Sequence, residues 1–187
     1  TSQADRSGEL QLRLDRDELV RRYAAGEREF HHAVLVGVDL SRLDLRQIDL
    51  TGSDLARCKL FETNLEGANL TECNLEGVFL AKSHLSGAVA RRTKFTGCRM
   101  DRINWKDLDL QGARLDHANL QGAQLDHCRM RKARLREANL SGATLHDVRL
   151  YAANLSDANL QGAKLNHCKF QNACLVQADL SQARLVD

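Results

Sequence analysis

The sequence predicts an all-β solenoid, a rod in which the chain coils around a single apolar axis. Three observations lead to this prediction. An apolar residue, usually leucine, recurs at every fifth position, and glycine recurs two places after many of these residues. The chain also lacks proline and has only 4% aromatic residues, which is unusual for the core of an ordinary globular domain.

The five-residue period runs without a slip from Phe30 to Leu185. It comprises 32 positions, of which 25 are leucine. Five residues rotate an α-helix by about 140°, and an odd step along a strand changes faces, so neither element can bury these side chains together. The chain must therefore turn after each repeat, which gives a solenoid of stacked short strands.

Two further positions of the repeat support this interpretation. The residue two places before nearly every core position is small or apolar, as in Ala68 and Cys73, and the residue between them is usually polar, as in Asn69. A corner after each core residue favours glycine, which tolerates positive φ. Ten of the twelve glycines lie at this corner: Gly37, Gly52, Gly67, Gly77, Gly87, Gly97, Gly112, Gly122, Gly142 and Gly162.

Runs such as Ala68-Asn69-Leu70, Ala118-Asn119-Leu120 and Ala178-Asp179-Leu180 match the motif A(D/N)LXX, and the chain thereby resembles the pentapeptide-repeat family. The resemblance covers residues 30–185. It implies a right-handed quadrilateral β-helix with four pentapeptides per coil, or about eight coils.

We expect three segments in a single domain. Residues 1–14 form an N-terminal tail whose first several residues are disordered and whose later part holds a short strand. Residues 15–29 form a capping helix, because Asp15 and Glu18 have the spacing of a capping box and Gly26 suits the helix end. Residues 30–187 form the β-helix.

The C-terminal coil has no cap in the sequence. An uncapped solenoid exposes its core and a strand edge. We therefore expect an end-to-end homodimer through Leu175, Leu180 and Leu185. A truncated chain is the alternative explanation.

No apolar stretch long enough for a membrane span and no signal peptide is visible, so we expect a cytoplasmic bacterial protein without a membrane partner. The chain begins with Thr1, so the native N-terminus is open to question. Core thiols fit a reducing compartment. We expect Cys174 to be exposed and the other five cysteines to be core packing: Cys58, Cys73, Cys98, Cys128 and Cys168.

Residues 20 apart should stack on the rod, and one such ladder alternates acid and imidazole: Asp107, His127, Asp147, His167 and Asp187. Metal ligation is one interpretation. Stacked opposite charges, as in a second ladder of Arg42, Glu62 and Lys82, are the favoured one. No nucleophile with a base, no phosphate loop and no cleft is evident, so we expect no enzyme, no cofactor and no metal.

Residues 81–136 hold 13 basic and 5 acidic residues, which predicts a positive band around the middle of the rod. It is either a solvated surface or a surface for an anionic partner. The candidate residues are Arg91, Arg92, Arg129, Arg131, Lys132, Arg134 and Arg136.

Two aromatic features complete the candidates. Phe61 and Phe79 should face outward in adjacent coils, either as isolated apolar residues or as a contact for a partner protein. The coil of Ala90, Phe95, Met100 and Trp105 lacks leucine, which indicates volume compensation in one core layer and a locally altered surface.

The resemblance implies binding rather than catalysis, since members include DNA-imitating proteins that protect topoisomerase and regulators of cell differentiation. The positive band disfavours DNA imitation. The segment from Tyr23 to Phe30 is similar to the segment that leads into the first repeat of the regulators. We therefore expect a non-enzymatic scaffold or regulator that binds an unidentified protein through outward faces. The alternative is binding of nucleic acid or another polyanion by the positive band.

Overall fold

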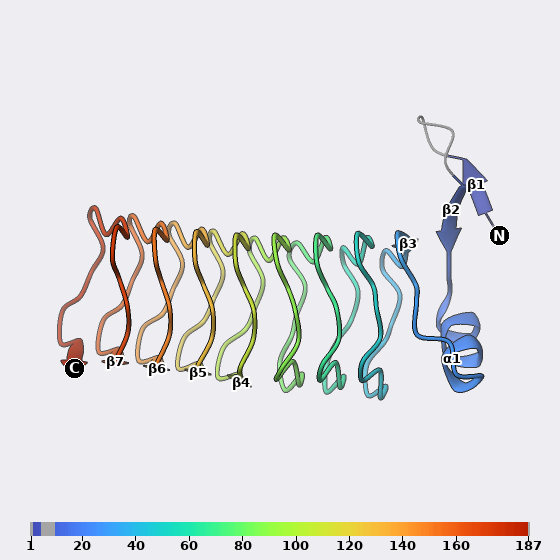
Figure 1. The fold of residues 1–187 in the computed structure, drawn as a ribbon, viewed down its shortest axis with the longest axis horizontal. Coiled ribbons are helices and arrows are strands. Elements are labelled where there is room, and N and C mark those ends of the chain that lie inside the picture. The colour runs from blue at the N-terminus through green and yellow to red at the C-terminus, as the bar shows by residue number, and fades with distance from the viewer. Residues whose placement is uncertain (1, 5–9, 187) are drawn as a thin grey trace.

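The protein is a straight rod with a short helix at its N-terminal end (Figure 1). The structure is a computed structural model and describes residues 2–4 and 10–186. The expectation of disorder falls partly outside the described residues; residues 2–4, by contrast, form a strand. Within the described ranges, no helix is both long and apolar enough to cross a bilayer.

Two strands and the helix precede the coils. Strand β1 (Ser2–Ala4) pairs antiparallel with β2 (Leu10–Arg13), and β2 pairs parallel with β3 (Ala33–Val34) in the first coil. Helix α1 spans Arg16–Ala24. These elements lie at one end of the rod, as Figure 1 shows. The boundaries set at residues 14 and 29 stay predictions.

Helix α1 begins and docks as its sequence dictates. The Asp15 carboxylate accepts a hydrogen bond of 2.8 Å from the Glu18 backbone N–H, which caps the first turn. Leu19 is fully buried in the continuous core, and the Tyr23 hydroxyl donates to the Arg46 carbonyl at 2.9 Å. The helix therefore covers the open end of the first coil.

Each coil contains 20 residues. Isolated parallel bridges join residues 20 apart along the rod, for example Asp49 to Asn69 and Asn119 to Asn139. Main-chain bonds such as Leu50 N–H to the Asn69 carbonyl, 2.8 Å, join successive coils. Four pentapeptides per coil and the all-β solenoid with an N-terminal helix are confirmed.

The recurring apolar residues form one core. Every core position from Phe30 to Leu165 is buried, and the small inward positions lie among them. Where an inward position carries a polar group, that group usually donates to a carbonyl of the preceding coil; Ser83 instead donates to Leu80 of its own coil. Thr63 donates to Leu40 at 2.9 Å and Cys73 to Leu50 at 2.9 Å, so no donor is left unsatisfied at these sites.

The corners need a left-handed residue, but glycine is not required. The second residue after the core position has positive φ in glycines such as Gly52 (70°) and also in Arg42 (62°) and Lys82 (56°). A side chain in this conformation costs roughly 1–2 kcal/mol. The continuous core and main-chain ladders hold the corners in place despite that cost.

One corner of the coil has a different backbone conformation from Trp105 onward. In earlier coils this corner is closed by a hydrogen bond across the turn, such as Ala68 N–H to the Leu65 carbonyl, 3.0 Å. From Trp105 onward the chain continues as a short strand instead. These strands form one parallel sheet: β4 (Asn104–Lys106), β5 (Gln124–Asp126), β6 (Thr144–His146), β7 (Lys164–Asn166) and β8 (Arg184–Val186).

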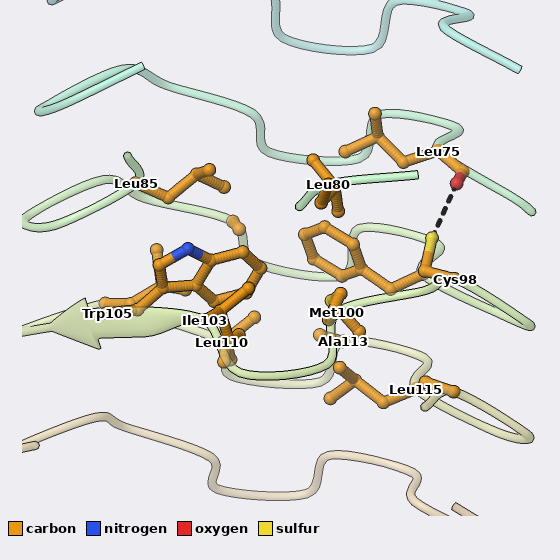
Figure 2. Packing of buried hydrophobic residues seen from close by; sticks show 14 of the residues in the cluster. Leu75, Leu80, Leu85, Cys98, Met100, Ile103, Trp105, Leu110, Ala113 and Leu115 are labelled. Atoms are coloured by element: carbon orange, nitrogen blue, oxygen red, sulfur yellow. Dashed lines mark hydrogen bonds between the residues drawn. The ribbon is translucent and has the colours of Figure 1, made fainter. Parts of the chain in front are cut away.

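Trp105 stands where this change begins. Its buried indole N–H donates to the Ser83 carbonyl at 3.2 Å. Phe95 packs against it with ring centroids 6.4 Å apart. Figure 2 shows the indole below Leu85 of the preceding coil and in one layer with Met100. The small Ala90 is buried in the same coil, and its compensation for this bulk stays a prediction.

Candidate functional surfaces

The two outward phenylalanines lie against each other. The rings of Phe61 and Phe79 are stacked with centroids 6.3 Å apart and planes inclined by 13°. The Lys82 ammonium lies 5.4 Å from the Phe61 centroid, and the Arg99 guanidinium lies 5.0 Å from that of Phe79. Cations at these distances are attracted to the ring faces. We call these four residues the aromatic patch.

A hollow of about 470 Å³ adjoins the aromatic patch on the side of helix α1. It is lined by Phe61, Arg16, Asp39, Ser41 and Arg42. Arg16 crosses from the helix and donates to the Ser41 carbonyl at 3.3 Å. The aromatic patch is therefore continuous with a concave, polar surface that joins the cap to the coils.

Most of the predicted positive band is engaged in ion pairs. Arg91 contacts the buried carboxylate of Asp109 at 2.7 Å, which Arg129 approaches at 4.0 Å. Arg92 pairs with Glu72 at 2.6 Å, and Arg134 with Asp116 at 3.1 Å. These contacts leave fewer unpaired cations in the band than its 13 basic residues suggest.

Arg136 belongs to the same group, since it lies 3.4 Å from Asp157 and 3.6 Å from Glu137. Arg131 and Lys132 have no ion pair within the described part of the chain. With Arg91, Arg92, Gln111 and Gly112 they line a hollow of about 390 Å³. This hollow is the most concentrated basic surface among the predicted candidates.

A second basic ladder was missed by sequence reasoning. Arg129, Arg149 and Lys169 are joined by successive parallel bridges, and all three line a hollow of about 540 Å³. The signal was present as a 20-residue spacing. It was obscured because Arg149 and Lys169 belong to a segment whose overall charge is near zero.

The ladder of Arg42, Glu62 and Lys82 consists of stacked ion pairs, and the acid–imidazole ladder has one such contact between its described members. Glu62 lies between Arg42, at 3.2 Å, and Lys82, at 3.3 Å. In the second ladder His127 Nδ1 lies 3.4 Å from Asp147 Oδ2. Asp187 lies outside the described residues. The 20-residue spacing did not predict that His146, at the end of β6, also contacts Asp147: its Nε2 atom lies 3.3 Å from Asp147 Oδ2.

The cysteines divide as expected, with Cys168 only partly buried. All six are free thiols, and Cys174 is exposed. Burial raises the pKa of the Cys58, Cys73, Cys98 and Cys128 thiols to about 12. A hydrogen-bonding contact of 3.1 Å with the Ser156 hydroxyl lowers the pKa of Cys174.

The altered coil has a surface hollow, of about 610 Å³, next to its buried tryptophan. Glu62, Lys82, Ser83, His84, Arg102, Ile103 and Asn104 line it. The hollow lies where the Trp105 indole contacts Ser83. The repacked core layer therefore coincides with a change in surface shape.

The last coil exposes much of its apolar content. Leu175 is half-buried, and Leu180 and Leu185 are exposed. Strand β8 has β7 as its only partner strand within the described part of the chain. Self-association through Leu175, Leu180 and Leu185 stays a prediction.

These features define the class: the chain is a solenoid repeat protein with one continuous core. Residues 29–67 and 68–104 match the family described as pentapeptide repeats (8 copies), and residues 100–180 match the pentapeptide repeat region family. The chain therefore belongs to the pentapeptide-repeat family.

Solved structures of this family are similar to the chain. Full-length QnrB1, a plasmid-mediated fluoroquinolone resistance protein, is 18% identical with a TM-score of 0.56, over 94% of this chain and 91% of that one. HetL, involved in heterocyst differentiation regulation in the cyanobacterium Nostoc sp. strain PCC 7120, is 28% identical with a TM-score of 0.32, over 93% and 98%. The likeness to QnrB1 supports the fold alone. The comparison with curated proteins found no match.

Proposed function

We propose that this protein is a non-enzymatic scaffold that binds a partner protein through the aromatic patch. The observation that carries the proposal is the stacked, outward pair of Phe61 and Phe79, with a cation over each ring. Two of the five phenylalanines of the chain lie together on the outside of the rod, although the core holds large apolar residues elsewhere. Aromatic residues flanked by arginine are typical of interface centres.

The rest of the surface suits recognition by such a patch. The adjoining hollow offers Asp39 and Arg42 for polar contacts at the rim, and a rigid rod loses little entropy on binding. The cytoplasmic location stays a prediction.

Affinity capture from a lysate of the source organism tests the scaffold. We expect one protein to be retained by the wild type and lost with Phe61→Asp/Phe79→Asp. Val36→Asp is the matched control, because Val36 is an exposed apolar residue outside the patch. Equal retention by the wild type and the double variant would contradict the proposal.

Polyanion binding is the second candidate, and the hollow lined by Arg91, Arg92, Arg131 and Lys132 favours it. Phosphate contacts would make the affinity for single-stranded DNA fall steeply with salt concentration. We expect Arg131→Gln/Lys132→Gln to weaken such binding and Arg57→Gln, on another corner, to leave it unchanged. A protein interaction at the aromatic patch should depend little on salt.

Topoisomerase protection is the third and least favoured candidate. The likeness to QnrB1 is one of fold, and the positive band differs from the acidic surface that DNA imitation requires. A supercoiling assay in the presence of a quinolone tests it. We expect no rescue of supercoiling.

A further inference from the structure

Three side chains converge where strands β5 and β6 end. His127 follows β5, His146 is the last residue of β6, and Asp147 follows it. Each offers one ligand atom, and these three atoms all lie within 4.8 Å of one another. The three residues come from two adjacent coils, so the main-chain ladder of the solenoid fixes their relative height.

The altered corner creates this convergence. In coils before Trp105 the corresponding corner is closed by a turn hydrogen bond, for example Ala88 N–H to the Leu85 carbonyl, 3.0 Å. In β6 the extended strand carries on to His146, and Asp147 follows with φ of 53°. Consecutive residues of this corner thus reach the same point as His127 of the preceding coil.

The Asp147 carboxylate lies between the two imidazoles. Its Oδ2 atom is 3.4 Å from His127 Nδ1 and 3.3 Å from His146 Nε2. Ligands about 2.0–2.1 Å from a tetrahedral Zn²⁺ are separated by about 3.3 Å, the edge of the tetrahedron. Two of the three separations already have this length.

We propose that His127, His146 and Asp147 form a binding site for a borderline divalent metal ion, of which Zn²⁺ is the type. Two neutral imidazoles and one carboxylate are a ligand set that suits this class of ion. Three protein ligands leave one tetrahedral position open to solvent or to an exogenous anion.

The surroundings bear on that open position. His127 and Asp147 line the 540 Å³ hollow together with one further carboxylate and three cations: Asp107, Arg129, Arg149 and Lys169. These cations oppose a bare metal ion and favour one whose remaining ligand is anionic. The ring of His167 contacts His146 edge-on at a centroid distance of 5.6 Å, outside the three-atom set.

A simpler ladder elsewhere on the rod provides the comparison. His117 Nδ1 lies 3.3 Å from Glu137 Oε2, with the same 20-residue spacing and similar exposure. Among the described residues, this pair has no third ligand atom close enough to complete a candidate metal site. If both clusters are only charge ladders, substitution of His117 and of His127 should affect Zn²⁺ binding equally. If His127 belongs to a metal site, only its substitution should weaken Zn²⁺ binding.

Titration of Zn²⁺ by calorimetry tests the proposal. The protein should carry Cys174→Ser, so that an exposed thiol does not bind Zn²⁺ on its own, and should have no affinity tag. We expect one ion per chain, and at least about a tenfold weaker affinity after His127→Gln, His146→Gln or Asp147→Asn. Because these side chains are on the surface, circular dichroism should show an unchanged fold.

His117→Gln is the matched control and should leave the affinity unchanged. Replacement of Zn²⁺ by Co²⁺ gives a second readout, since its visible absorption reports nitrogen and oxygen coordination and should disappear with His146→Gln. Two results would overturn the proposal: no saturable binding below about 1 mM Zn²⁺, or equal binding by the wild type and His146→Gln.

Discussion

At the scale of single residues, Trp105 has the largest structural consequence. It is the only tryptophan, is completely buried, packs against Phe95 of its own coil and donates its N–H to the preceding coil. We expect Trp105→Ala to reduce the free energy of unfolding by about 3–5 kcal/mol, because it leaves a large cavity. Urea denaturation followed by circular dichroism measures this change.

Two further variants separate the contributions of Trp105. Trp105→Phe keeps part of the packing but leaves the Ser83 carbonyl without the indole donor, at a cost of about 1–3 kcal/mol for the unmade hydrogen bond. Phe79→Ala removes an exposed ring and should cost much less. A Trp105→Ala variant as stable as the wild type would show that the indole lies outside the core.

The thiols differ enough to be distinguished by their reactivity. Contact with Ser156 lowers the pKa of Cys174, whereas burial raises that of Cys73 to about 12. The thiolate is the reactive form, so Cys174 should be alkylated first, with a rate that rises with pH until its lowered pKa is passed. Mass spectrometry of peptides after brief iodoacetamide treatment measures the order.

Cys174→Ser supplies the control for this experiment. In that variant the native protein should incorporate almost no label on the time scale of the wild-type reaction, while the unfolded chain should label at all remaining cysteines. Rapid labelling of Cys58 or Cys98 in the native state would contradict the tightly closed core.

At the scale of elements, helix α1 protects the first coil. Leu19 is fully buried against a core that includes Phe30, while Val20 is only partly covered. We expect Leu19→Ala to cost about 2–5 kcal/mol and to loosen the nearest coils first, because each coil contacts only its neighbours. Hydrogen exchange should rise in residues 30–50 and stay unchanged in β5–β7.

Val20→Ala is the control, since it shortens a neighbouring side chain of the same helix. It should leave exchange in the first coil close to that of the wild type. Uniform acceleration along the whole rod after Leu19→Ala would instead mean that the solenoid opens as one cooperative unit.

The elements also show what the sequence could predict. Periodicity identified the core ladder, the corners and the stacking of residues 20 apart, because these follow from one repeating geometry. It did not predict the strands β4–β8 or the approach of His146 to Asp147. Both features depend on whether one corner is closed by a turn hydrogen bond. The residue types at this corner do not indicate which form it takes, since the similar side chains of Ile48 and Leu108 hold the same inward position in the two kinds of corner.

The candidate surfaces follow the same division. Stacking placed Phe61 near Phe79 and Glu62 between two cations, since these are contacts between coils. Counting charges did not show which cations of the positive band are paired: Asp109 and Asp116, which the count includes, contact Arg91 and Arg134, and Glu72, from outside the counted segment, contacts Arg92. Pairing of this kind depends on rotamers, which a count does not contain.

At the scale of the whole molecule, the two ends of the rod differ. The N-terminal end is covered by α1, whereas Leu180, Leu185 and Val186 are exposed in the last described coil. We expect the chain to form an end-to-end dimer at micromolar concentrations, because association would bury these side chains and pair the edge of β8, which has no second partner strand among the described residues. Light scattering coupled to size exclusion measures the mass.

Leu180→Lys/Leu185→Lys should convert this dimer to a monomer, since two charges at the joint would have to be desolvated. Val36→Lys places a charge at an exposed apolar residue near the other end and should leave the dimer intact. A monomeric mass for the wild type would exclude the association. A dimer that persists after the double substitution would show that the chains associate through another surface. The aromatic patch would then be the next surface to substitute.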